Sequence, residues 1–281
     1  MTATPGTGLL RQTARPMLRR GLRAAEAGVV AAFVALVERQ ARVGRLTPRV
    51  EQAIADALRH VATTSKGRAR TGSPAVRELV DQFHRLCYDD GQTWRKNTWQ
   101  GRRTWKSPND LWLYQEIIHA LRPGLVIETG TAFGGSATYM GFLLDLEQKG
   151  RVVSVDIASR ATPPHPRVTY IAGSSTDPAV VDQVRSMVEP ADPVLVILDS
   201  DHSERHVYDE LRTYGDLVTV GSYVIVEDTN VNGHPAHPQH GPGPMEAVQR
   251  FLAERSDFVV DERMHRWHFT LNPHGYLRRI G

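Results

Sequence analysis

The stretch V-I-E-T-G-T-A-F-G-G-S, residues 126–136, constrains the fold of this chain more than any other. A β-branched apolar run ends in an acidic residue, a glycine-rich turn follows, and small residues then begin a helix. In an open α/β sheet the ligand crevice lies at the carboxyl ends of the strands, which is where this turn falls. The segment therefore predicts the first strand, turn and helix of an α/β domain that binds a nucleotide-like ligand.

The residues of the turn narrow the choice of ligand. The spacing lacks the second glycine of G-x-G-x-x-G, which lets a backbone approach a pyrophosphate, so a dinucleotide is disfavoured. A carboxylate at Glu128 would repel phosphates, but it suits the cationic end of S-adenosylmethionine. We expect Asp156, after the second strand, to bind ribose hydroxyls and Ser175, after the third, to meet an adenine edge. The alternative is that these side chains only cap helices.

Strand and helix signals alternate from residue 125 onward, in the manner of βαβ units. The expected strands are Leu125–Glu128, Arg151–Asp156, Val168–Ala172, Val194–Leu198, Ser222–Glu227, Phe258–Asp261 and Trp267–Leu271. The expected helices are Ser136–Glu147, Pro178–Val188, Ser203–Tyr214 and Pro244–Glu254. This order, closing with two strands, predicts an α/β fold with a Rossmann-like, seven-stranded, mostly parallel sheet.

Acidic residues follow two of these strands. Asp199 and Asp201 come after one buried strand, and Glu227 and Asp228 come after the next. Buried carboxylates are costly unless they are paired or bind a metal, and hard oxygen ligands without cysteine favour Mg²⁺. The alternative is that Asp201 and Asp228 cap the helix and the turn that follow them.

A second metal hypothesis rests on histidines. His202 and Glu204, joined by the distant His265 or His268, imitate the two-histidine, one-carboxylate set of non-haem iron oxygenases. Both His202 and Glu204 leave a strand end where a helix begins, an awkward place for both to point inward. An iron-dependent hydroxylase is therefore the alternative function.

The segment before the sheet is rich in tryptophan and basic residues. It could wall a substrate site, pack against the domain, or bind single-stranded nucleic acid. We expect a substrate wall and no nucleic acid, because the net charge is only +3. The residues are Trp94, Arg95, Lys96, Trp99, Arg102, Arg103, Trp105 and Lys106.

Residues 1–75 are predicted to be a helical extension of a domain at 76–281. Residues 1–70 hold 13 Lys or Arg and 4 Asp or Glu, a basic and partly apolar composition that favours self-association into a homo-oligomer. The apolar run Ala27–Val37 is shorter than the roughly 20 residues that span a bilayer and has no clear cleavage site, so we expect a cytoplasmic protein. The single cysteine, Cys87, agrees with a reducing compartment.

From about Phe83 to Tyr276 the chain resembles the cephalosporin hydroxylase family. This group of class I S-adenosylmethionine-dependent methyltransferases includes the metal-dependent sugar O-methyltransferases of macrolide antibiotic biosynthesis. The matching stretches are N-T-W-Q-G at 97–101, D-L-W-L-Y-Q-E at 110–116, I-E-T-G-T at 127–131, I-L-D-S-D-H-S at 197–203, V-E-D-T-N-V-N-G-H at 226–234 and G-P-G-P-M-E-A at 241–247.

The resemblance implies a Mg²⁺-dependent O-methyltransferase that acts on a hydroxyl of a sugar or of a glycosylated or polyketide natural product. It implies that Asp201, Glu227 and Asp228 hold Mg²⁺. The base does not carry over from the resemblance, and we expect either Asp201 or His202 to act as the base. Tyr139, Trp99 and the 229–243 loop are expected to shape the acceptor pocket. The residues implied for the S-adenosylmethionine site are Glu128, Gly130, Thr131, Ser136, Asp156, Ser175 and Asp199.

Overall fold

The computed structural model describes residues 74–158 and 164–281. The predicted N-terminal helices and the apolar run at 27–37 lie outside the described residues. His84–Gly281 form one compact unit. No helix in the described ranges combines the length and the apolar character needed to cross a bilayer.

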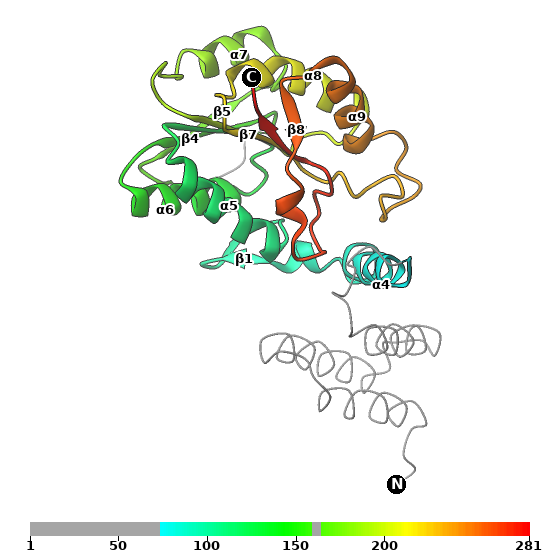
Figure 1. The fold of residues 1–281 in the computed structure, drawn as a ribbon. Helices are drawn as coiled ribbons and strands as arrows, with labels where there is room; N and C mark the ends of the chain where they lie inside the picture. The colour runs from blue at the N-terminus through cyan, green and yellow to red at the C-terminus, as the bar shows by residue number, and fades with distance from the viewer. Residues whose placement is uncertain (1–73, 159–163) are drawn as a thin grey trace, which may run out of the picture. The chain divides into compact units, whose positions relative to one another are not determined.

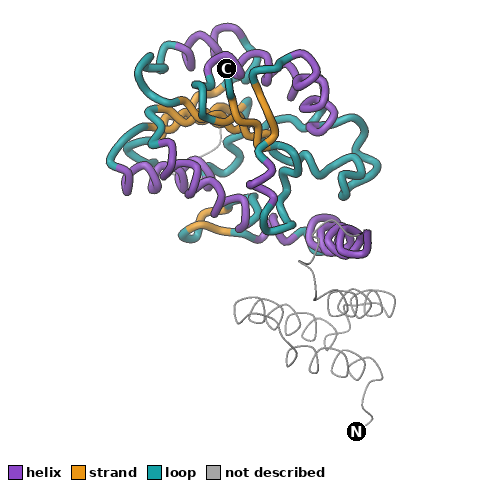
Figure 2. Tube along the Cα trace, in the orientation of Figure 1, coloured by secondary structure: helices purple, strands orange, loops and turns teal. Residues whose placement is uncertain are grey.

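A seven-stranded sheet forms the centre of this unit, with strand order β5-β4-β3-β6-β7-β9-β8 (Figures 1 and 2). β3 to β7 run parallel, whereas β9 is antiparallel to both of its neighbours. The strands are β3 (Leu125–Thr129), β4 (Arg151–Asp156), β5 (Val168–Ala172), β6 (Val194–Leu198), β7 (Tyr223–Val226), β8 (Phe258–Val260) and β9 (Tyr276–Arg279). The predicted mostly parallel, seven-stranded fold is confirmed.

Helices cover both faces of the sheet, because alternate residues of its buried strands point to opposite sides. Ile127 and Val196 pack with helices α7, α8 and α9, whereas Val126 and Ile197 pack with α5 and α6 (Figure 1). The helices are α5 (Pro108–Leu121), α6 (Gly135–Glu147), α7 (Pro178–Arg185), α8 (Glu204–Tyr214) and α9 (Pro244–Glu254). Burial on both faces explains why these strands are continuous apolar runs.

Shorter elements precede the sheet and fill its connections. Helix α4 (Pro74–Arg85) leads into a π-helical turn, η1 (Leu86–Asp90). The segment rich in tryptophan and basic residues folds into a short helix and a two-stranded hairpin. These elements are η2 (Thr93–Lys96), β1 (Thr98–Trp99) and β2 (Arg102–Arg103). The remaining 3₁₀ turns are η3 (Gly215–Leu217) and η4 (Glu262–His265).

The predicted strand Trp267–Leu271 is wrong, since the last strand is β9 at Tyr276–Arg279. Residues 267–271 form turns, in which Thr270 and Leu271 are buried and Trp267 and His268 are exposed. The buried pair is fixed by the carboxylate of Asp110, which accepts hydrogen bonds from the Thr270 hydroxyl and from the Leu271 amide. Thr270 and Leu271 are therefore buried by their contacts with a side chain of α5, although they do not lie in a strand.

The register of the strands brings their carboxyl ends to one edge. Thr129 of β3 pairs with Leu198 of β6, and Leu198 pairs in turn with Val226 of β7. The turn at Gly130 and the acids that follow β6 and β7 therefore emerge side by side.

Candidate active site

The turn after β3 approaches the end of β6 so closely that only glycine fits. Gly130 has a φ of +87°, and a Cβ added there would lie 1.8 Å from the Asp199 carbonyl oxygen. The Gly130 amide donates to the Val155 carbonyl of β4 at 2.8 Å. The turn is thereby held against both neighbouring strands.

A cavity of about 1070 Å³ opens at this edge of the sheet. Its volume matches the upper range of small-molecule sites. Seven predicted residues line it: Gly130, Asp156, Ser175, Asp199, Asp201, His202 and Asp228. Thr131 and Ser136 instead line a pocket of about 20 Å³ that shares Gly130 and Asp199 with the large cavity. The strand ends predicted to carry the chemistry thus meet at one hollow.

Glu128 lies beneath the cavity and does not line it. Its carboxyl group is fully buried, and Oε2 accepts a hydrogen bond from the Ser154 hydroxyl at 2.6 Å. The other oxygen, Oε1, has no hydrogen-bond partner among the described residues. Burial raises the pKa of Glu128 to about 7, although Lys106, Ser136 and Ser154 act in the opposite direction. A group within reach that carries positive charge would satisfy this carboxyl group.

Asp156, the last residue of β4, and Ser175, beyond the end of β5, line the cavity. The Asp156 carboxylate accepts the Ala132 amide at 2.9 Å and the Ala158 amide at 2.7 Å, so it ties the turn to the end of β4. Ser175 lies 3.1 Å from Nε2 of His206, a cavity residue that the sequence analysis missed. Both predicted side chains face the cavity, but each also has a structural role.

One histidine and two carboxylates converge at the ends of β6 and β7. The possible ligand atoms of Asp199, His202 and Asp228 all lie within 4.8 Å of one another. His202 Nε2 is 3.2 Å from Asp228 Oδ2 and 3.9 Å from Asp199 Oδ1. Burial raises the pKa of Asp228, and the negative charge of Asp199 raises it further, while His202 lowers it. A cation bound among these atoms would offset the repulsion between the two carboxylates.

A buried lysine, Lys106, lies between the acids; the expectation that it belongs to a substrate wall is wrong, because it is 1% exposed and does not line the large cavity. Lys106 Nζ lies 2.5 Å from Asp199 Oδ2 and 2.6 Å from Glu227 Oε1. Glu227 also accepts a hydrogen bond from the Tyr114 hydroxyl of α5. Glu227 is almost fully buried and lines neither pocket, so its carboxylate reaches the cavity only by way of Lys106 and Asp199.

The predicted metal set of Asp201, Glu227 and Asp228 is not assembled in this structure. Asp201 is exposed, and its carboxylate accepts the Ser203 amide at 2.8 Å, just before α8 begins. Hydrogen bonds from Ser203 lower the pKa of Asp201. The structure therefore groups Asp228 with Asp199 and His202, and the capping alternative describes Asp201.

Aromatic side chains form one wall of the cavity. Tyr88 stacks on Trp94, and Trp94 meets Trp105 edge to face, each pair with centroids 5.6 Å apart. These three residues line the cavity together with Arg95 and with loop residues such as Val231 and His237. Trp99 and Tyr139 do not line it; their rings pack against each other with centroids 4.9 Å apart. Of the residues expected to shape an acceptor pocket, residues of the 229–243 loop line the cavity, whereas Trp99 and Tyr139 do not.

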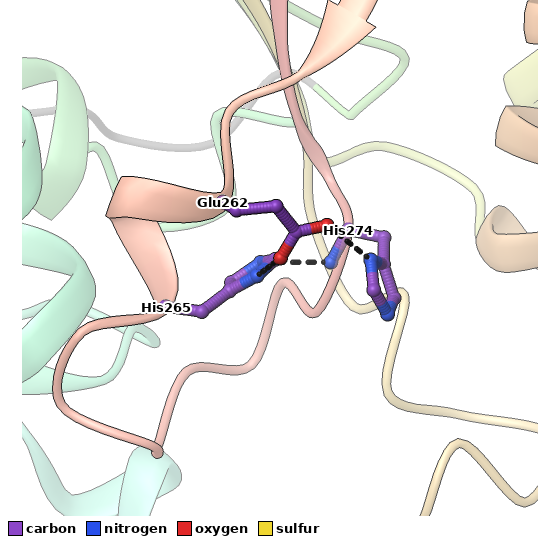
Figure 3. Close-up of side chains that lie close together, drawn as sticks. All are labelled: Glu262, His265 and His274. Atoms are coloured by element: carbon purple, nitrogen blue, oxygen red, sulfur yellow. Dashed lines mark hydrogen bonds and ion pairs between the residues drawn. The ribbon is translucent and has the colours of Figure 1, made fainter. Parts of the chain in front are cut away.

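The residues of the iron hypothesis do not converge. His265 lies beside Glu262 and His274 (Figure 3). None of these three residues lines the cavity that His202 lines. Nδ1 of His265 is 3.0 Å from Glu262 Oε2, and its Nε2 accepts the His274 amide at 2.9 Å. Both ring nitrogens of His265 are therefore occupied, and Glu204 of α8 pairs with Arg250.

Comparison with known proteins agrees with the geometry. The family model for rhamnosyl O-methyltransferase/CmcI matches residues 91–280. A rhamnosyl O-methyltransferase of Mycobacterium bovis is 39% identical over 209 residues, which is 72% of this chain and 85% of the relative. The corresponding protein of Mycobacterium leprae is 38% identical over 208 residues, covering 72% and 90%.

A more distant relative and a solved structure extend the comparison. An 8-demethyl-8-α-L-rhamnosyl tetracenomycin-C 2′-O-methyltransferase of Streptomyces olivaceus is 30% identical over 89 residues, 32% of this chain and 23% of that protein. A ligand-free structure of CmcI has the same fold, with a TM-score of 0.53 at 24% identity, covering 66% of this chain and 77% of that one. The chain belongs to the rhamnosyl O-methyltransferase/CmcI family and is a class I S-adenosylmethionine-dependent O-methyltransferase.

Proposed function

We propose that this protein transfers the methyl group of S-adenosylmethionine to a hydroxyl of a rhamnosyl or related sugar, with Mg²⁺ at the acceptor end of the cavity. The observation that carries the proposal is that one hollow holds both the turn after β3 and the Asp199, His202 and Asp228 group. The sugar acceptor is supported by the names of the relatives that match most of this chain.

The cofactor would lie over the ends of β3, β4 and β5. Asp156 would accept ribose hydroxyls with the lone pairs that the Ala132 and Ala158 amides leave free. Ser175 and His206 would meet the adenine from the end of β5. Glu128 would act from beneath the turn, where its uncompensated oxygen favours the cationic end of the molecule. Thr131 and Ser136 remain predicted members of this site.

The donor atoms at β6 and β7 fit a hard divalent cation, because they are mainly carboxylate oxygens. We assign Asp199 and Asp228 as the residues that would hold Mg²⁺, with Glu227 adjacent through Lys106, and Asp201 outside the set. A solved CmcI structure with Mg and SAM has the same fold, at 22% identity and a TM-score of 0.53. When bound, Mg²⁺ would lower the pKa of an acceptor hydroxyl.

His202 is the proposed general base. It lines the cavity, and its ring faces Asp228 at 3.2 Å. An imidazolium formed when His202 accepts the hydroxyl proton is stabilised by this carboxylate. The residues of the turn and of the acidic group then hold donor and acceptor in line, a positioning effect that supplies much of the rate.

The acceptor would pack against the rings of Tyr88, Trp94 and Trp105, which offer rigid apolar surface next to the acids. The Tyr88 hydroxyl donates to Asp228 Oδ1 at 3.3 Å, so this wall touches the proposed metal site directly.

A product assay tests the proposal. Chelator-treated protein is incubated with S-adenosylmethionine and a panel of rhamnosides, with and without Mg²⁺, and products are followed by mass. We expect a gain of one methyl group on a rhamnoside only when Mg²⁺ is present, and a loss of at least about 100-fold in rate for His202→Ala. Methylation of catechols but of no rhamnoside would overturn the acceptor assignment.

A further inference from the structure

Lys106 is the most buried positively charged side chain at the active site, and the proposed methyl transfer does not use it. We propose that Lys106 is a resident counter-ion of the acidic site: it holds Asp199 and Glu227 in place without metal and weakens the binding of Mg²⁺. This inference rests on the proposed function. It makes Lys106 a positioning residue, since the transferred methyl group does not need to touch it.

The chain delivers Lys106 to this position by a rigid route. The Asn97 side chain donates to the Lys106 carbonyl at 2.8 Å, which fixes the backbone at the end of the hairpin. Ser107 follows directly and caps α5 by accepting the Asn109 amide at 3.2 Å. The Lys106 side chain is 1% exposed and reaches acids more than 90 residues further along the chain. A side chain placed in this way cannot leave the site by simple rotation into water.

The charge of Lys106 is maintained by its surroundings. Its ammonium group lies between two carboxylates, 2.5 Å from Asp199 Oδ2 and 2.6 Å from Glu227 Oε1, and these opposite charges favour the charged form of the lysine. An ammonium group between two buried carboxylates satisfies charges that would otherwise be uncompensated. Removal of one partner of a buried ion pair is more damaging than removal of both.

The balance of charge gives the site its affinity for cations. When the carboxylates of Asp199, Glu227 and Asp228 are all ionised, they exceed the single positive charge of Lys106 by two, an excess that one divalent ion would offset. Lys106 also lies directly on Asp199, a proposed ligand, and its positive charge opposes an incoming cation. With Lys106 the site is stable when empty and binds Mg²⁺ reversibly. Without it the empty site is strained and binds Mg²⁺ more tightly.

The test compares Lys106→Met with a matched control, Lys149→Met, in the full chain. Lys149 also forms an ion pair, with Asp192 at 2.7 Å, but both of those side chains are about one-third exposed. The Mg²⁺ dissociation constant is measured by calorimetry on chelator-treated protein, and thermal midpoints are recorded with and without Mg²⁺. For Lys106→Met we expect a lower metal-free midpoint, a larger rise with Mg²⁺ and at least tenfold tighter binding. Lys149→Met should match the wild type in all three.

The outcomes separate this inference from the proposed function. Wild-type affinity and an unchanged Mg²⁺-induced rise in Lys106→Met would overturn the counter-ion role, while Mg²⁺ binding by the wild type would leave the proposed function intact. If the wild type binds no Mg²⁺, the proposed metal site fails, and with it the claim that Lys106 weakens Mg²⁺ binding.

A double variant tests the pairing itself. If Lys106→Met does not fold, Lys106→Met combined with Glu227→Gln removes both charges and is expected to regain a cooperative thermal transition. A double variant no more stable than Lys106→Met would contradict the counter-ion role, because a lysine needed only for packing gains nothing from loss of the glutamate charge.

Discussion

At the scale of single residues, the site depends on contacts that leave no alternative side chain. Gly130 is the clearest case, because both its φ and its distance to the Asp199 carbonyl exclude a Cβ. Gly221 has a nearly identical φ of +89° but nothing within 4 Å of its would-be Cβ. Comparing the two glycines separates the cost of a left-handed backbone from the cost of the steric clash at the site.

We therefore expect Gly221→Ala to cost only the backbone strain, about 1 kcal/mol, and Gly130→Ala to cost clearly more, at least about 3 kcal/mol. Urea unfolding of the two variants measures this difference. Gly130→Ala should also lose S-adenosylmethionine binding, whereas Gly221→Ala keeps it. Equal destabilisation of the two variants would show that the close approach to Asp199 is not tight.

Glu128 predicts a dependence of stability on pH. Its folded-state pKa is about 7, above the ordinary value of 4.5, so the folded protein binds this proton more tightly than the unfolded chain. The contribution is fully present below about pH 4.5 and is lost as the pH rises toward and through 7. At about 1.4 kcal/mol per pKa unit, the loss is on the order of 3 kcal/mol.

Glu128→Gln cannot ionise, so the difference in unfolding free energy between wild type and variant should shift in favour of the variant from pH 4.5 to 7. Chemical unfolding of both proteins at several pH values measures this shift. A constant difference over that range would mean that Glu128 does not titrate there.

At the scale of elements, the loop before β9 supports the turn that carries the acids. The Asp228 amide donates to Asn272 Oδ1 at 3.1 Å, and the Thr229 hydroxyl donates to the Pro273 carbonyl at 2.6 Å. Asp228 has a φ of +52°, an uncommon value for a residue with a side chain, so outside contacts are needed to hold it. The geometry of one proposed Mg²⁺ ligand is thus set by a loop more than 40 residues away.

Asn272→Ala is therefore expected to weaken Mg²⁺ binding about tenfold and to lower stability by about 1–2 kcal/mol, the cost of an unpaired buried amide. S-adenosylmethionine binding should stay unchanged, since Asn272 does not line the cavity. Calorimetry with each ligand measures both effects. Ser186→Ala, which removes an exposed side-chain hydrogen bond to the Gln183 carbonyl, is the control. Equal loss of both ligands would point to general unfolding.

The elements also show how far the sequence could lead. The parallel strands were predictable because β-branched and apolar residues dominate them and polar turns bound them, and β4, β5 and β6 match their predicted bounds. The segment Trp267–Leu271 was wrongly predicted to be a strand, because Thr270 and Leu271 are buried by the Asp110 side chain and not by a sheet. The ion pairs of Lys106 could not be predicted, since nothing in the sequence W-K-S-P indicates a partner at the ends of β6 and β7. Asp199 belongs to the acidic group and Asp201 does not, because of the backbone conformation after β6. The spacing of the two residues in the sequence does not reveal this difference.

At the scale of the whole molecule, the predicted division at residue 75 remains a proposal. A chain of residues 76–281 should unfold in one cooperative transition and bind S-adenosylmethionine as tightly as the full chain, because His84–Gly281 form one compact unit. Light scattering of both chains tests the predicted self-association, with the full chain larger than a monomer and the shorter chain monomeric. Loss of cofactor binding in the shorter chain would contradict the predicted boundary.

The most direct test of the central claim is calorimetric titration of chelator-treated protein with S-adenosylmethionine, with and without Mg²⁺, in the wild type and in Asp228→Asn. We predict cofactor binding by both proteins, and a separate Mg²⁺ site that is at least about tenfold weaker in the variant, a change of about 1.4 kcal/mol. Failure of the wild type to bind S-adenosylmethionine in either condition would contradict the account.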